Sequence, residues 1–134
     1  MKVYKRGQKE VIALRGVDFE VDSGEFLSII GPSGSGKSTL LKMIGALDKP
    51  TAGAILYDGH GVTTLDDRRS MLYRRQKVGF VWQIGNLVPG LSALKNVILP
   101  MKLAGAPSKA SEERARMLLD SCLLYTSPSP RDRS

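Results

Sequence analysis

The distribution of apolar and polar positions first predicts β-strands. Residues 11–21 are rich in branched side chains, and Val17, Phe19 and Val21 alternate with polar residues, which is typical of a half-buried antiparallel strand. After a turn at residues 22–25, the segment 26–30 (FLSII) is almost wholly apolar. Such a short run is typical of a strand that is buried on both faces of a parallel sheet. We therefore expect an antiparallel strand followed by a core strand.

The next apolar positions have helical spacing. Residues 38–47 carry an apolar face, and Pro50 and Gly53 indicate that the helix ends before them. The residues of that face are Leu40, Leu41, Ile44 and Leu47. Because a glycine-rich stretch separates them from the apolar strand, the predicted order is strand, loop and helix.

The middle of the chain predicts three further elements. Residues 52–59 resemble a strand that enters a turn, and residues 77–83 resemble a buried strand with a polar last residue. Between them, Thr64 and Asp67 have the spacing of a capping box at the start of a basic helix. That helix is more simply a solvated face than a nucleic-acid site.

Two helices are predicted after residue 90. The first has an apolar face and is expected to break near Pro100. Its apolar residues are Leu94, Val97, Ile98 and Met101. The second covers residues 111–121, and its apolar side consists of Ala115, Leu118 and Leu119.

Composition narrows the possible functions. The 134 residues are 42% hydrophobic, which suits one globular domain, and no apolar run approaches the ~20 residues that cross a bilayer. The N-terminal residues do not resemble a signal peptide, so we expect a cytosolic protein. A net charge of +7 suits an anionic partner such as a nucleotide, a nucleic acid or a lipid headgroup.

Single residues exclude other chemistry. Cys122 is the only cysteine and His60 the only histidine, which argues against a disulfide, a zinc site or a Cys-His nucleophile. His60 lies between two glycines and is most simply a solvated turn residue.

Residues 31–38 match the pattern G-x-x-x-x-G-K-[ST], the Walker A loop. Glycines permit unusual backbone angles and leave room for a phosphate, while backbone N–H groups and the helix N-terminus attract it. Lys37 is expected to reach the β- and γ-phosphates of ATP, Ser38 to ligate Mg²⁺ and Thr39 to bind the α-phosphate. The expected nucleotide-binding residues of the loop are Gly31, Pro32, Ser33, Gly34, Ser35, Gly36, Lys37, Ser38 and Thr39.

Together with "GALDKPTAG" (45–53), "GFVWQ" (79–83) and "NLVPGLSALKNVILP" (86–100), this loop makes the chain resemble the ATPase domain of ABC transporters. The resemblance covers nearly all of residues 1–121 and is strongest for the branch that serves macrolide export and lipoprotein release. It implies an α/β fold, namely the N-terminal portion of a P-loop NTPase with an antiparallel β-subdomain and an incomplete parallel core sheet.

The resemblance also implies roles for residues outside the loop. Tyr4 corresponds to the aromatic residue that stacks on adenine, although a strand tyrosine can simply pack on its neighbours. Gln83 corresponds to a glutamine that contacts Mg²⁺ or the attacking water and would act with Lys37 in catalysis, or it is a polar cap at a strand end. The apolar residues that follow would either dock a membrane subunit or pack a helical subdomain. They are Leu87, Val88 and Leu91.

Residues 84–134 lack the family's signature motif, its Walker B carboxylate and its switch histidine. The family's chemistry takes place between two ATPase domains, so we expect this chain to bind ATP and Mg²⁺ without hydrolysing ATP. In the longer parent we expect a homodimer of ATPase domains on the cytoplasmic face of the membrane, with a separate or fused permease. No nucleic-acid partner is expected.

Residues 122–134 differ in character from the rest of the chain. The stretch 122–132 resembles an in-frame translation of a transposon-end sequencing adapter, so we expect a disordered, non-native tail after a native part at 1–121. A natural flexible tail is the alternative.

Two other functions are compatible with a P-loop sequence. A P-loop ATPase of repair or chromosome organisation would suit the basic charge, and salt-dependent DNA binding would support it. The spacing of 46 residues from Lys37 to Gln83 argues against it. A small non-catalytic nucleotide-binding module is the third possibility.

Overall fold

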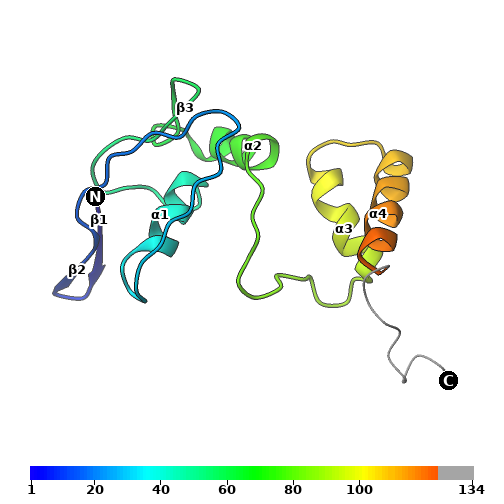
Figure 1. The fold of residues 1–134 in the computed structure, drawn as a ribbon, viewed down its shortest axis with the longest axis horizontal. Coiled ribbons are helices and arrows are strands. Elements are labelled where there is room, and N and C mark those ends of the chain that lie inside the picture. Colours follow the sequence, from blue (N-terminus) through cyan, green and yellow to red (C-terminus); the bar gives the residue numbers. More distant parts are fainter. Residues whose placement is uncertain (124–134) are drawn as a thin grey trace. The chain divides into compact units, whose positions relative to one another are not determined.

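The computed structural model describes residues 1–123, which form short antiparallel hairpins and helices in two units (Figure 1). The first unit covers residues 1–80, and the second begins at Val81. The first unit contains β1 (Lys2–Arg6), β2 (Lys9–Leu14), α1 (Lys37–Ile44), β3 (Leu56–Tyr57), β4 (His60–Gly61) and α2 (Asp67–Lys77). The second contains α3 (Ala93–Leu103) and α4 (Ser108–Leu123).

Helix α1 packs against strand β2 and forms the buried part of the first unit. Strands β1 and β2 pair in antiparallel fashion, with Tyr4 opposite Val11. Leu14 at the end of β2 and Met43 in α1 are both buried. Because β2 contacts the helix that follows the glycine-rich loop, this packing fixes the loop relative to the hairpin.

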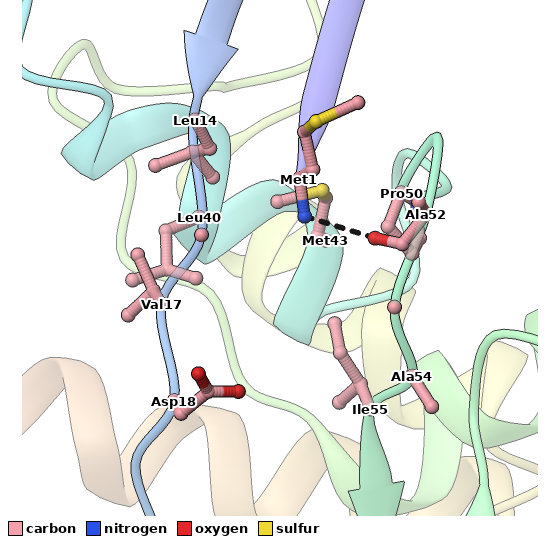
Figure 2. Close-up of a pocket in the computed structure, with 12 residues that line it drawn as sticks. Met1, Leu14, Val17, Asp18, Leu40, Met43, Pro50, Ala52, Ala54 and Ile55 are labelled. Carbon is pink, nitrogen blue, oxygen red and sulfur yellow. Dashed lines mark hydrogen bonds between the residues drawn. The ribbon is translucent and has the colours of Figure 1, made fainter.

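An apolar cavity of about 280 Å³ adjoins this core. Its lining residues come from α1, from the segment after β2 and from the loop of residues 50–55 (Figure 2). Leu40 and Met43 contribute the helical side, and Ile55 lies on the loop side (Figure 2). The N-terminal ammonium of Met1 donates to the carbonyl oxygen of Ala52 at 2.9 Å, which ties the start of the chain to that loop.

The β3–β4 hairpin has a two-residue turn. Asp58 and Gly59 have φ angles of 47° and 75°, as a type I′ turn requires at both positions. Helix α2 is attached to the end of α1, since the Tyr73 hydroxyl donates to the carbonyl oxygen of Ile44 at 3.1 Å. Arg74 likewise donates to the carbonyl oxygen of Ala46 at 2.7 Å.

Helices α3 and α4 lie side by side in the second unit (Figure 1). Ala115 on α4 is fully buried, as its position on the apolar face predicts, but Leu118 is exposed. The expected break at Pro100 is wrong, because α3 continues through it to Leu103. Proline removes one backbone donor, and a short helix that packs along α4 tolerates that loss.

Three predicted strands are corrected by the structure. Within residues 1–123, the segments 17–21, 26–30 and 78–83 form no strand and belong to no sheet. Phe26 and Ile30 are each 92% exposed, so the core strand is not buried here. An apolar pattern alone does not make a strand, because a strand also needs a hydrogen-bonded neighbour, and none pairs with these segments in the described chain.

Helix ends also differ in detail from the predictions. Asp66, rather than Thr64, caps α2, and its carboxylate accepts the Arg69 N–H at 2.7 Å. The predicted strand at 52–59 shortens to β3, while α4 extends to Leu123, so Cys122 is helical and exposed. The rest of the predicted tail, residues 124–134, lies outside the described residues. Within residues 1–123, no helix is both long and apolar enough to span a bilayer.

Candidate functional site

The Walker A stretch forms a turn that leads directly into α1. The N–H of Ser35 donates to the carbonyl oxygen of Pro32 at 3.2 Å, and Gly34 and Gly36 have φ angles of 80° and 95°. Gly36 is the N-cap of α1, and no side chain caps that end. The first N–H groups of the helix therefore remain available to an anion, as the sequence predicts.

Two glycines of the loop lie where a side chain would collide. A Cβ atom at Gly36 would lie 2.6 Å from the carbonyl oxygen of Ala13 and 2.7 Å from Cδ2 of Leu14. A Cβ atom at Gly31 would lie 2.8 Å from Oγ of Ser35. Strand β2 thus packs so closely against the loop at Gly36 that only glycine fits there.

The side chain of Lys37 folds over the loop. Its Nζ donates to the carbonyl oxygens of Gly31 and Pro32 at 2.6 and 2.7 Å, and lies 3.3 Å from Oγ of Ser35. An ammonium group has three protons, so these three acceptors use its full hydrogen-bonding capacity. The positive charge is thereby held at the loop, next to the uncapped helix end.

The remaining loop residues are accessible. Pro32, Ser33, Gly34, Ser35 and Ser38 are exposed, whereas Gly31, Gly36, Lys37 and Thr39 are half-buried. An exposed anion nest with a fixed ammonium fits a polyphosphate, and the exposed hydroxyl of Ser38 fits a Mg²⁺ ligand. The structure therefore brings together all nine predicted loop residues from 31 to 39.

Tyr4 lies in a polar cluster that the sequence analysis missed. Its hydroxyl donates to Oδ2 of Asp48 at 2.7 Å, and Oδ1 of Asp48 accepts from Lys2 Nζ at 2.7 Å. Lys2 Nζ also lies 4.9 Å from the centroid of the Tyr4 ring. No local sequence pattern predicts these contacts, because Asp48 lies 44 residues after Tyr4 and 46 residues after Lys2.

Hydrogen bonding changes the acidity of this cluster. The bond to Asp48 raises the pKa of Tyr4, and partial burial and the charge of Asp48 add to the rise, while a hydrogen bond from Thr39 opposes it. Partial burial alone would raise the pKa of Asp48. Hydrogen bonds from Lys2, Tyr4 and the Lys49 N–H outweigh it and leave the pKa of Asp48 below its ordinary value. The cluster therefore favours an ionised Asp48 beside a neutral Tyr4.

Two other residues that the sequence analysis singled out belong to other segments of the chain than this loop. Gln83 belongs to the second unit, where it is exposed in a bend, and its role stays a prediction. His60 is exposed in the hairpin, and its Nδ1 lies 2.8 Å from the carbonyl oxygen of Asp58. That contact fits the interpretation of His60 as a turn residue.

Comparisons with known proteins identify the family of the chain. The family model described as "ABC transporter" matches residues 14–127. An uncharacterized ABC transporter ATP-binding protein of Thermotoga maritima is 54% identical over 119 residues, which are 89% of this chain and 51% of that protein. The lipoprotein-releasing system ATP-binding protein LolD of Saccharophagus degradans is 41% identical over 120 residues, which are 90% of this chain and 53% of LolD.

A solved structure extends the likeness to three dimensions. The dimeric post-hydrolysis structure of the ATP-binding cassette MJ0796 of Methanocaldococcus jannaschii, bound to ADP and Pi, has a TM-score of 0.82 at 44% identity. The matched region covers 89% of this chain and 53% of the MJ0796 chain. This chain therefore spans about half the length of the relatives it matches. The matched family model, the relatives and this fold agree on one identity: the chain belongs to the ABC transporter family and has the P-loop NTPase fold of its ATP-binding cassettes.

Proposed function

We propose that this chain is the nucleotide-gripping part of an ABC transporter ATPase and that it binds Mg-ATP through residues 31–39. The single observation that carries the proposal is the position of the Lys37 ammonium, which the loop holds beside the uncapped N-terminus of α1. Positive charge and free N–H groups at one place are what a triphosphate requires.

The chain's own groups divide the work as follows. Backbone N–H groups of residues 34–39 would bind phosphate oxygens, and Lys37 would exchange a loop carbonyl for the β- and γ-phosphates. Bound Mg²⁺ would offset phosphate charge, and the Ser38 hydroxyl would hold it. Gln83 would orient the attacking water or contact the metal, for which an amide is suited because it does not compete for the water's proton.

Hydrolysis belongs, in this proposal, to the longer parent. The relatives are about twice as long as the matched region, and residues 84–134 contain no signature motif and no Walker B carboxylate. We therefore propose that the chain alone binds ATP but does not turn it over. The dimeric structure of MJ0796 supports a parent that works as a homodimer of ATPase domains.

The proposed biological role is export or lipoprotein release through a membrane permease, separate or fused, at the cytoplasmic face of the membrane. The similarity of the chain to LolD, the ATP-binding protein of a lipoprotein-releasing system, supports this branch. Within the second unit, an apolar surface precedes α3 and is the proposed contact for the permease. Its residues are Leu87, Val88 and Leu91, which are all exposed.

Calorimetric titration with Mg-ATP, Mg-ADP and adenosine, together with a steady-state phosphate-release assay, tests the proposal on residues 1–134. We expect ATP to bind, adenosine to bind at least tenfold more weakly because it lacks the charge that Lys37 and the helix attract, and no turnover. Equal affinity for adenosine and ATP would contradict the proposal that residues 31–39 bind the phosphates. Measurable turnover would contradict the assignment of hydrolysis to the longer parent.

A further inference from the structure

The most informative feature outside the loop is the cluster of Tyr4, Asp48 and Lys2. Tyr4 is 37% exposed as a residue, yet its hydroxyl is fixed by a 2.7 Å hydrogen bond to Oδ2 of Asp48. A hydrogen bond at the hydroxyl oxygen fixes the tip and the axis of the ring, but this oxygen lies on the axis of rotation of the ring plane. The plane is oriented instead by the Lys2 ammonium, which Asp48 also binds and which lies over one face of the ring.

Asp48 is itself held by other groups. Its Oδ1 accepts from Lys2 Nζ at 2.7 Å and from the backbone N–H of Lys49 at 2.8 Å. Lys2 Nζ also donates to the carbonyl oxygen of Lys49 at 2.6 Å. The carboxylate that anchors Tyr4 is therefore part of a connected network and does not depend on a single flexible contact.

The ammonium group of Lys2 lies over one face of the Tyr4 ring. Its nitrogen lies 4.9 Å from the ring centroid, a separation at which a cation is attracted to the π-face, so a planar ligand would use the other face. The Lys2 side chain is only 12% exposed, which shows that it is packed into this position.

The cluster is connected to the phosphate loop through α1. Asp48 follows the helix by four residues, and the loop precedes the same helix directly. Strand β2, which pairs with the strand of Tyr4, contacts the position of Gly36 in the loop. Ring and loop therefore share one frame built from α1 and the β1–β2 hairpin.

We propose that Asp48 is a positioning residue that fixes the open face of the Tyr4 ring for a purine base, at a set place relative to the phosphate loop. The inference rests on the proposed function, since it takes Tyr4 as the base-stacking residue. Asp48 acts through Tyr4 and Lys2 and does not touch the nucleotide. Loss of Asp48 would leave the phosphate contacts intact and weaken only the contribution of the base.

The test compares Mg-ATP with Mg-tripolyphosphate, which lacks the base, by calorimetry on residues 1–134. We expect Asp48→Ala to weaken ATP binding about two- to tenfold, the effect of leaving one side chain unordered before binding, and to leave tripolyphosphate binding unchanged. Asp48→Asn keeps a hydrogen-bond acceptor for Tyr4 and should restore part of the affinity. Asp120→Ala removes an equal charge from an exposed site on α4 and should change neither ligand.

Tyr4→Phe keeps the ring but removes the hydroxyl, so it serves as the second variant if Asp48→Ala does not fold. It should show the same selective loss for ATP, and the double variant should lose no more than either single one. The inference would be overturned by equal losses of affinity for both ligands, by no loss, or by losses that add in the double variant. None of these outcomes would contradict phosphate binding by residues 31–39. Failure of the unmodified chain to bind either ligand would overturn the proposed function and the inference with it.

Discussion

The Nζ atom of Lys37 lies 2.6 Å from the carbonyl oxygen of Gly31, six residues earlier in the chain. The lysine that the motif assigns to phosphates is thus bound by the loop that would receive them. An incoming phosphate oxygen has to replace at least one of the loop acceptors. In the proposed function, binding would therefore exchange hydrogen-bond partners of an ammonium group that is already in place, and the long Lys37 side chain would not have to be ordered first.

Gly36→Ala should destabilise the first unit and weaken ATP binding more than tenfold. The new Cβ would meet the carbonyl oxygen of Ala13 at 2.6 Å, and the φ angle of 95° disfavours any side chain. Overpacking of this kind costs about 1–3 kcal/mol. Urea unfolding and a nucleotide titration measure the two effects.

Gly79→Ala is the matched control for that substitution. A Cβ at Gly79 meets no atom within 4 Å. We expect a change within about 0.5 kcal/mol and no effect on ATP binding. If Gly36→Ala behaved like Gly79→Ala, the described contact between β2 and the loop would be wrong.

Asp66→Ala should lower the free energy of unfolding by about 1 kcal/mol, since its carboxylate caps α2 by accepting the Arg69 N–H. Thr64→Ala is the comparison, because the sequence pattern favours Thr64 as the cap. Its hydroxyl makes only a 3.4 Å contact with the carbonyl oxygen of Gly61, so a smaller effect is expected. Thermal unfolding followed by circular dichroism ranks the two variants, and the reverse order would restore Thr64 as the cap.

Asn96→Ala should release the loop before α3. The side-chain oxygen of Asn96 accepts the Val88 N–H at 2.7 Å, and its amide donates to the carbonyl oxygens of Leu91 and Ser92. Hydrogen exchange at the Val88 amide should therefore become faster in the variant. Lys95→Ala, on the neighbouring exposed position, should leave that exchange rate unchanged; equal acceleration in both would show that the bond gives no protection.

Acidification tests the charge of Asp48. Its pKa in the folded chain lies below the ordinary value of 3.8, so folding favours the ionised form. The resulting stability is fully present above the unfolded-state pKa and is lost as the pH falls below 3.8 through the folded value. The difference in unfolding free energy between the unmodified chain and Asp48→Asn should be constant near neutral pH and shrink on acidification. A difference that grew as the pH fell would contradict the network around Asp48.

The turn at residues 31–36 and the start of α1 were predictable from sequence because both are local features of the chain. Consecutive residues form the turn and carry the Lys37 ammonium, and the helix that follows begins at Lys37 as the spacing indicates. Their roles toward phosphate and Mg²⁺ stay predictions. The cluster of Tyr4, Asp48 and Lys2 was not predictable in full. Tyr4 was found by resemblance, whereas Asp48 reaches it across 44 residues, and no local pattern encodes that contact.

The predicted core strands, in contrast, do not form in the described chain. The apolar run at residues 26–30 predicts a buried strand, but these residues form no strand, and Phe26 and Ile30 are exposed in the described chain. Strand formation depends on partners that are distant in sequence, and the matched relatives are about twice as long as this region. Helices satisfy their own backbone groups, which is why α1, α2, α3 and α4 were all anticipated.

The most direct test of the central claim is a calorimetric titration of residues 1–134 and of Lys37→Ala with Mg-ATP. The account predicts that the unmodified chain binds and that the variant loses at least tenfold in affinity, since a charge-assisted hydrogen bond contributes roughly 1.5–3 kcal/mol. Lys42→Ala, on the exposed side of α1, should bind like the unmodified chain. Equal affinity of Lys37→Ala and the unmodified chain for Mg-ATP would contradict the claim that this loop is the phosphate grip.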